Sequence, residues 1–118
     1  MSNPEMSMIE ECRAIYERAK KRVDAANKQI AEWRTQMDKL VENSQYTKVC
    51  LNGMDRWFSR NDTDPVIVNQ RAYWTDVLKR NEEEWYDLQD KIVELSDMTA
   101  DAAKDVRRFG AYLAQVSA

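Results

Sequence analysis

The amino-acid sequence predicts an all-α protein: a long antiparallel hairpin of two helices that pack as a coiled coil. Its 118 residues include only two glycines and two prolines, which leaves little material for the turns of a β-rich fold. Apolar residues recur at alternating spacings of three and four in both halves of the chain, with one polar segment between them. A chain of this length is expected to form a single domain, residues 1–118.

The first helix is predicted over residues 6–58. Its heptad positions are all apolar up to Leu40 in a chain that is 43% hydrophobic overall, so the period is not a chance pattern. These seam positions are Ile9, Cys12, Tyr16, Ala19, Val23, Ala26, Ile30, Trp33, Met37 and Leu40. A glycine costs about 1 kcal/mol inside a helix. Asn52 and Gly53 therefore leave two alternatives open, a continuous arm or a break at 52–53.

Residues 59–65 are predicted to form the turn. Asn, Asp and Thr side chains there compete with the helix for backbone hydrogen bonds, and Pro65 suits the first position of a new helix with Asp64 or Thr63 as its N-cap. The second helix is then predicted over 66–116. Its seam positions are Trp85, Leu88, Ile92, Leu95, Thr99, Ala102, Val106, Phe109, Leu113 and Val116, of which only Thr99 is polar.

Folding the chain back about this turn predicts the pairing of the two helices. Leu40 then lies opposite Trp85, and every a position meets a d position. Ser44 falls opposite Asn81, where the two side chains can form a hydrogen bond, whereas a slipped pairing would bury each against hydrocarbon at a cost of about 1–3 kcal/mol. Two interpretations of this layer remain: a device that fixes the register, or a locally hydrated and weak layer.

Apolar side chains outside the seam are the best candidates for a functional site. A two-helix hairpin leaves them partly exposed, and contiguous exposed apolar surface is typical of interfaces. The candidate partner interface near the turn comprises Val41, Val49, Cys50, Trp57, Val68, Tyr73 and Val77. Self-association into a four-helix bundle or a larger helical assembly would cover these residues. The alternative is that they only widen the intramolecular seam.

The cations are concentrated at the open end of the predicted hairpin, and the anions lie further along both arms. A formal net charge of −3 argues against a general nucleic-acid-binding protein but leaves a local basic site open. The candidate patch for an anionic partner comprises Arg18, Lys20, Lys21, Arg22, Lys104, Arg107 and Arg108. Three interpretations remain: a solvated surface, electrostatic guidance of assembly or of docking on an acidic partner, and a nucleic-acid site.

The residues that most enzymes need are missing from the sequence. There is no histidine, which removes the usual general base and the Ser–His and Cys–His nucleophile pairs. Two distant cysteines cannot form a zinc site, and Gly53 and Gly110 do not make a phosphate-binding loop. We therefore expect no catalytic residue, no metal and no cofactor, and a non-enzymatic function.

The sequence also bears on where the protein acts. No apolar run approaches the roughly 20 residues needed to span a bilayer, so no membrane insertion is expected. The N-terminus lacks the basic segment and apolar stretch of a Sec-type signal peptide. With two thiols expected to be reduced, the prediction is a cytoplasmic protein, and export without a leader is the alternative.

Two helices joined by a polar turn resemble, in topology, the short WXG100-type secretion substrates and the needle and filament subunits of bacterial export machines. The Trp-x-Gly turn of the former is missing, and the chain has Asn52-Gly53-Met54 and Trp57-Phe58-Ser59 instead. This resemblance implies an alternative function as a secreted hairpin or filament subunit. The favoured hypothesis is an interaction or assembly module, such as an adaptor, chaperone, inhibitor or structural subunit, and its expected partner is a second copy or a larger target protein.

Overall fold

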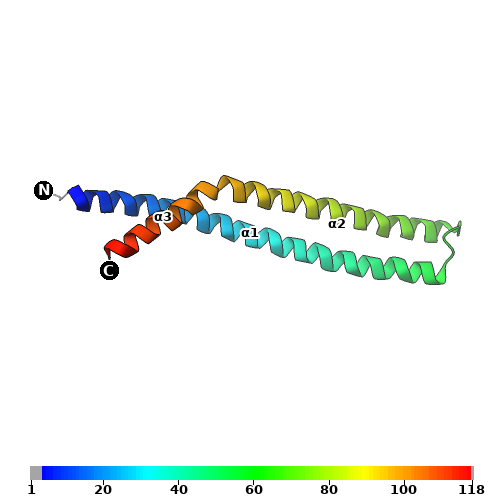
Figure 1. The fold of residues 1–118 in the computed structure, drawn as a ribbon. Coiled ribbons are helices and arrows are strands. Elements are labelled where there is room, and N and C mark those ends of the chain that lie inside the picture. The colour runs from blue at the N-terminus through cyan, green and yellow to red at the C-terminus, as the bar shows by residue number, and fades with distance from the viewer. Residues whose placement is uncertain (1–3, 118) are drawn as a thin grey trace. The chain divides into compact units, whose positions relative to one another are not determined.

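The computed structural model describes residues 4–117, and these residues form three helices and no strand (Figure 1). Helix α1 spans Pro4–Trp57, α2 spans Pro65–Met98 and α3 spans Ala100–Val116. The chain divides into two compact units. Unit 1 joins residues up to Ala31 to residues from Ile92 onward, and unit 2 is Glu32–Lys91. The predicted all-α helical hairpin is confirmed, whereas a single domain over 1–118 stays a prediction.

The core follows the predicted seam. The buried apolar residues are Ala19, Ala26, Ile30, Met37, Leu88, Ile92 and Ala102, and each occupies a heptad position of the seam. Helix α1 runs without interruption through Asn52 and Gly53, so the expected alternative of a break there is not present. Continuity follows from packing, because Leu51 and Met54 on either side keep the seam period and are partly buried.

In unit 1 the first part of α1 packs against the last turns of α2 and against α3. Arg22 Nη2 of α1 lies 3.5 Å from the carbonyl oxygen of Met98, to which it donates a hydrogen bond. A Cβ atom placed on Gly110 of α3 would come within 3.2 Å of the Tyr16 ring. Gly110 therefore permits a close approach between α3 and α1 that a larger residue would hinder.

The second helix was expected to be continuous over 66–116, but the structure divides it at Thr99. The Thr99 hydroxyl donates a hydrogen bond of 2.9 Å to the carbonyl oxygen of Leu95, one turn earlier, and such bonds bend helices. Backbone bonds still cross this point, from Thr99 N to Leu95 O and from Ala103 N to Thr99 O. The division between α2 and α3 is thus a local distortion at the polar residue of the seam.

In unit 2 the turn has the chemistry that the sequence indicates. Asp64 caps α2, because its Oδ1 accepts a 2.9 Å hydrogen bond from the backbone N–H of Val66. Pro65 is the first residue of α2, where its missing N–H costs nothing. Ser59 and Asp62 close the turn through a 3.1 Å bond from Asp62 N to Ser59 O. The prediction of Asp64 or Thr63 as N-cap is confirmed for Asp64.

The predicted polar layer of unit 2 joins α1 to α2 through side-chain hydrogen bonds. Asn81 Nδ2 donates hydrogen bonds to Ser44 Oγ at 3.2 Å and to Asn43 Oδ1 at 2.7 Å. The Ser44–Asn81 pairing is therefore confirmed, and Asn43 joins it. The nearby Thr47 is fully buried, but its hydroxyl donates within α1 to the carbonyl oxygen of Asn43 at 2.8 Å.

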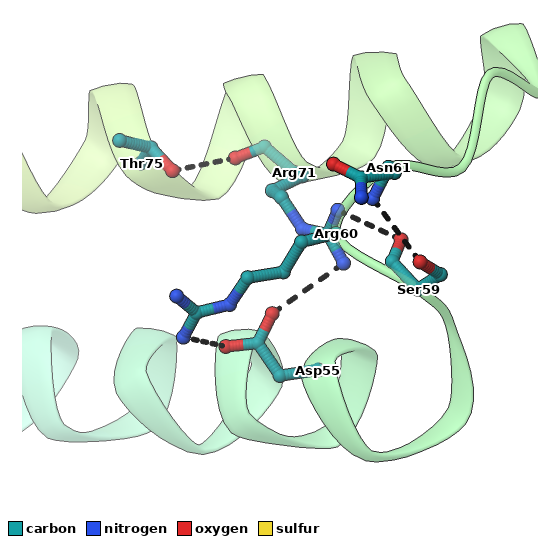
Figure 2. A network of polar contacts seen from close by, with 6 residues as sticks. All are labelled: Asp55, Ser59, Arg60, Asn61, Arg71 and Thr75. Carbon is teal, nitrogen blue, oxygen red and sulfur yellow. Dashed lines mark hydrogen bonds and ion pairs between the residues drawn. The ribbon is translucent and has the colours of Figure 1, made fainter.

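A second polar contact ties the end of α1 to the start of α2 around Arg71, which occupies a seam position (Figure 2). Arg71 Nη1 donates to the carbonyl oxygen of Ser59 at 3.3 Å. Its Nη2 lies 3.4 Å from Asp55 Oδ1, and Arg60 Nη2 lies 3.4 Å from Asp55 Oδ2. Asp55 therefore sits between two guanidinium groups, and the Arg71 side chain is only 21% exposed.

This arrangement predicts that Asp55→Ala destabilises unit 2 more than Arg71→Met does. Without Asp55 the partly buried guanidinium keeps its charge and loses its counter-ion, at an expected cost of about 1–2 kcal/mol in the free energy of unfolding. Arg71→Met removes the charge and supplies an apolar side chain to an apolar seam, so its cost is expected to be smaller. Urea unfolding followed by circular dichroism measures both. The reverse order would show that the bond to Ser59 matters more than the ion pair.

Candidate functional site

The structure distributes the candidate interface residues over different sides of unit 2. Cys50 and Trp57 on α1, and Tyr73 and Val77 on α2, lie beside the seam on one side, because each pair recurs at helical spacing. Val41 and Val68 lie beside the seam on the opposite side, and Val49 points outward from α1. The first four therefore belong together, and the other three do not join them.

The side that carries Cys50 and Trp57 holds a second stripe of heptad spacing on each helix. On α1 this stripe comprises Tyr46, Cys50, Gly53 and Trp57. On α2 it comprises Val66, Gln70, Tyr73 and Val77. We call these eight residues the aromatic face. Aromatic contacts link the two stripes, because the rings of Tyr46 and Tyr73 both pack edge-on against Trp74, with centroids 6.2 and 5.0 Å away.

Most of the large side chains of the aromatic face are exposed to solvent. Trp57 is 79% exposed, Val66 69%, Tyr46 62% and Tyr73 54%. Together they expose roughly 500 Å² of side chain, taking about 150–250 Å² for a complete aromatic residue. An area of that size is at the upper end of the largest apolar patches on typical monomers, about 300–600 Å².

Gly53 lies in the middle of the α1 stripe and has no structural need within its own chain. A Cβ atom placed on it would meet nothing within 4 Å. Its φ angle is that of an ordinary helical residue, so no special backbone conformation requires glycine there. The residue therefore leaves an open notch in the helix surface between Cys50 and Trp57.

The opposite side of unit 2 has two shallow hollows. Val41 lines the first, of about 430 Å³, together with Lys48, Glu82 and the exposed ring of Tyr86. Val68 lines the second, of about 510 Å³, beside Arg71. These two valines are thus separated along the hairpin, and charged side chains accompany both of them. This side of unit 2 does not form a continuous apolar surface like the aromatic face.

The cations of the candidate basic patch encircle unit 1 and do not share one side. Helical spacing places Lys20 and Arg107 beside the seam on one side and Arg22 on the other, with Lys21 pointing outward. Among residues 4–117 none of the candidate cations forms an ion pair with a carboxylate. Arg108 lies 5.2 Å from the centroid of the Phe109 ring.

The sequence-based set missed four members of the aromatic face: Tyr46, Gly53, Val66 and Gln70. The signal for the two apolar ones was their spacing, because Tyr46 precedes Cys50 by one helical turn and Val66 lies two turns before Tyr73. Tyr86, which is 56% exposed on the opposite side, was missed as well. Its neighbour Trp85 belongs to the seam, and the two rings pack edge-on at 5.2 Å.

Within the described part of the chain, no group of three or more Cys, Asp or Glu side chains could hold a metal ion. No helix among residues 4–117 is long and apolar enough to cross a membrane. Comparisons with models of protein families, with curated protein sequences and with solved structures found no significant match to this chain.

Proposed function

We propose that this protein is a non-enzymatic interaction and assembly module that binds a protein partner through the aromatic face of unit 2. The observation that carries the proposal is the exposure of Trp57, at 79%, on the same side as Tyr46 and Tyr73. Large aromatic side chains that combine apolar area with a polar group are enriched among the residues that dominate binding energy. An adaptor, a chaperone, an inhibitor and a structural subunit would all use such a face.

The size of the face sets the expected affinity. The exposed surface of these four residues is roughly 500 Å², and burial of its apolar part is worth at most about 12 kcal/mol at about 25 cal/mol per Å². Association costs about 4–15 kcal/mol in lost translational, rotational and side-chain freedom. The apolar face alone therefore supports a moderate and reversible complex, and additional polar contacts around it would be needed for a tight one.

The chemistry of the chain supports a role without catalysis in the cytoplasm. The sequence has no histidine to act as general base at neutral pH. Cys12 and Cys50 are both partly buried, and neither forms a disulfide within the chain. The dispersal of the cations around unit 1 gives no concentrated phosphate-binding surface, so a protein partner is favoured over nucleic acid.

The proposal predicts that Trp57→Ala combined with Tyr73→Ala abolishes partner binding and leaves the fold intact. Each hot-spot residue typically contributes about 2 kcal/mol or more, so the double variant is expected to lower the affinity by at least several hundredfold. Helicity and melting temperature should change little because both side chains are more than half exposed. Sedimentation of the purified protein, and quantitative capture from extracts of the native host, measure the binding.

The matched control is Val41→Ala combined with Tyr86→Ala, which truncates exposed apolar side chains on the opposite side of unit 2. This control should associate like the wild type. The proposed function would be refuted by two results together. The wild-type protein would sediment as a monomer, and every protein that it captures would also be captured by the double variant. Equal losses in the test and control variants would mean that binding does not depend on the aromatic face.

A further inference from the structure

We infer that the aromatic face binds a second copy of the chain, and that the two turns lie at the same end of the resulting four-helix unit. This inference rests on the proposed function and specifies its partner. It follows from the angle between the two apolar stripes of each helix, from the residues that such a pairing would bring together, and from the charges that flank the face.

The angle between the stripes fits a four-helix bundle. At about 100° per residue, the stripe of the aromatic face lies about 110° around each helix from the seam. A helix in a four-helix bundle contacts two neighbours at roughly a right angle, one through each stripe. Both α1 and α2 have their second stripe on the same side of unit 2, so one further hairpin can cover both. A symmetric dimer supplies that hairpin with the same surface on each copy.

The contacts across the proposed dimer interface can be assigned in the same way as those of the seam, by pairing alternate positions of the two stripes of the aromatic face. With the turns at the same end, α1 of one copy faces α2 of the other in antiparallel orientation. Four layers near the turn then join Trp57 to Val66 of the second copy, Gly53 to Gln70, Cys50 to Tyr73, and Tyr46 to Val77. A small residue meets a larger one in two of these layers. The pairing thus gives a reason for Gly53, whose notch would accept the Gln70 side chain of the second copy.

Charges beyond the apolar layers favour the same orientation. Continuing away from the turn, the next layers join Asn43 to Arg80, Lys39 to Glu84, and Glu32 to Lys91 of the second copy. No pair in this series has like charges, and such complementarity selects orientation. In the reversed dimer α1 would face α1 of the second copy, and Lys39 would project beyond its turn. The reversed orientation would therefore lose the contacts of Lys39 with Glu84 and of Glu32 with Lys91, and Lys91 would keep only its ion pair with Asp87 of the same helix, 3.3 Å away.

The area is also sufficient for a dimer. Each copy contributes roughly 500 Å² of exposed side chain from the aromatic face, using about 150–250 Å² for a complete aromatic residue. Two copies reach roughly 1,000 Å² before the polar layers are added, and specific interfaces bury about 1,200–2,000 Å² in total. With the polar layers added, the total buried area reaches the range that is typical of a stable but dissociable dimer.

Cysteine cross-linking tests both the partner and the orientation. In a Cys12→Ser, Cys50→Ala background, which keeps position 50 of the aromatic face apolar, Lys39→Cys and Glu84→Cys place one thiol on each helix. Within a single chain, positions 39 and 84 lie beside the seam and both face the second copy, so they do not face each other. A disulfide is therefore expected only between copies. Mild oxidation should convert most of the protein to a covalent dimer. The control pair Lys39→Cys with Glu83→Cys moves one thiol to the outward side of α2 and should remain monomeric.

Each outcome decides one part of the inference. A covalent dimer from the test pair alone supports the orientation with both turns at one end. A wild-type dimer in sedimentation without selective cross-linking overturns that orientation and leaves the proposed function intact. Self-pairing alone is overturned if the wild type is a monomer that captures a different protein and the combined Trp57→Ala and Tyr73→Ala variant no longer captures it. Only a monomer that captures nothing overturns the proposed function as well.

Discussion

Replacing Leu88 by alanine is expected to lower the free energy of unfolding of unit 2 by about 3 kcal/mol, within the range of about 2–5 kcal/mol for buried Leu→Ala changes. Leu88 is only 4% exposed, and it lies in the seam layer that the register assigns to Met37, which is 8% exposed. A two-helix core has few layers, so neighbouring side chains can fill only part of the space that the substitution creates. Urea unfolding monitored by circular dichroism measures the loss.

Val49→Ala is the matched control for this measurement. Val49 is 68% exposed and points outward from α1, so its truncation is expected to change stability by less than about 0.5 kcal/mol. A cost below 1 kcal/mol for Leu88→Ala, on the scale of about 2–5 kcal/mol expected for a buried leucine, would mean that the seam around Met37 collapses to fill the cavity. The difference between the two variants, more than either value alone, reports how strongly the core depends on its seam.

The helices and their register could be predicted because both depend on a repeating pattern. The seam positions recur throughout the chain, so one irregular residue such as Gly53 did not end α1. The layer of Ser44 and Asn81 indicated the pairing, since a slip would separate Asn81 from the side chains of Ser44 and Asn43, to which it donates hydrogen bonds. Repetition therefore gives reliable information on the backbone.

Features that depend on single side chains were harder to predict. Thr99 was recognised as the polar exception in the second seam, but the hydroxyl bond to Leu95 that divides α2 from α3 is a local choice among several rotamers. Asn43 joined the polar layer because its amide reaches Asn81 from the flank of the seam. A heptad pattern assigns residues to positions and does not specify which flanking side chain will reach inward.

The candidate site shows the same difference. Trp57 and Tyr73 were expected to be exposed because they fall outside the seam, and both are. Exclusion from the seam does not say which side of the helix a residue occupies, so Val41 and Val68 were grouped with them. The second period runs from Tyr46 through Gly53 to Trp57. It shows which side of α1 belongs to the aromatic face and excludes residues on the other side of the seam.

Gly53→Lys is expected to raise the dimer dissociation constant more than a hundredfold, and it should stabilise the isolated chain slightly. In the single chain the new side chain enters open space, and removal of a helical glycine gains up to about 1 kcal/mol. In the proposed dimer the lysine would enter a close contact among apolar side chains, where an unpaired charge costs several kcal/mol. Sedimentation over a range of concentrations, with melting of the dilute protein, measures the two opposite effects.

Asn52→Lys is the control because it adds the same charge one residue earlier on α1. Asn52 is exposed, and helical spacing places it about 120° around α1 from the aromatic face. It should dimerise like the wild type. If Gly53→Lys also dimerises like the wild type, the aromatic face is not the dimer contact, since a buried lysine there would have no partner. If both variants lose dimerisation equally, the effect follows from net charge, and the close approach at Gly53 is excluded.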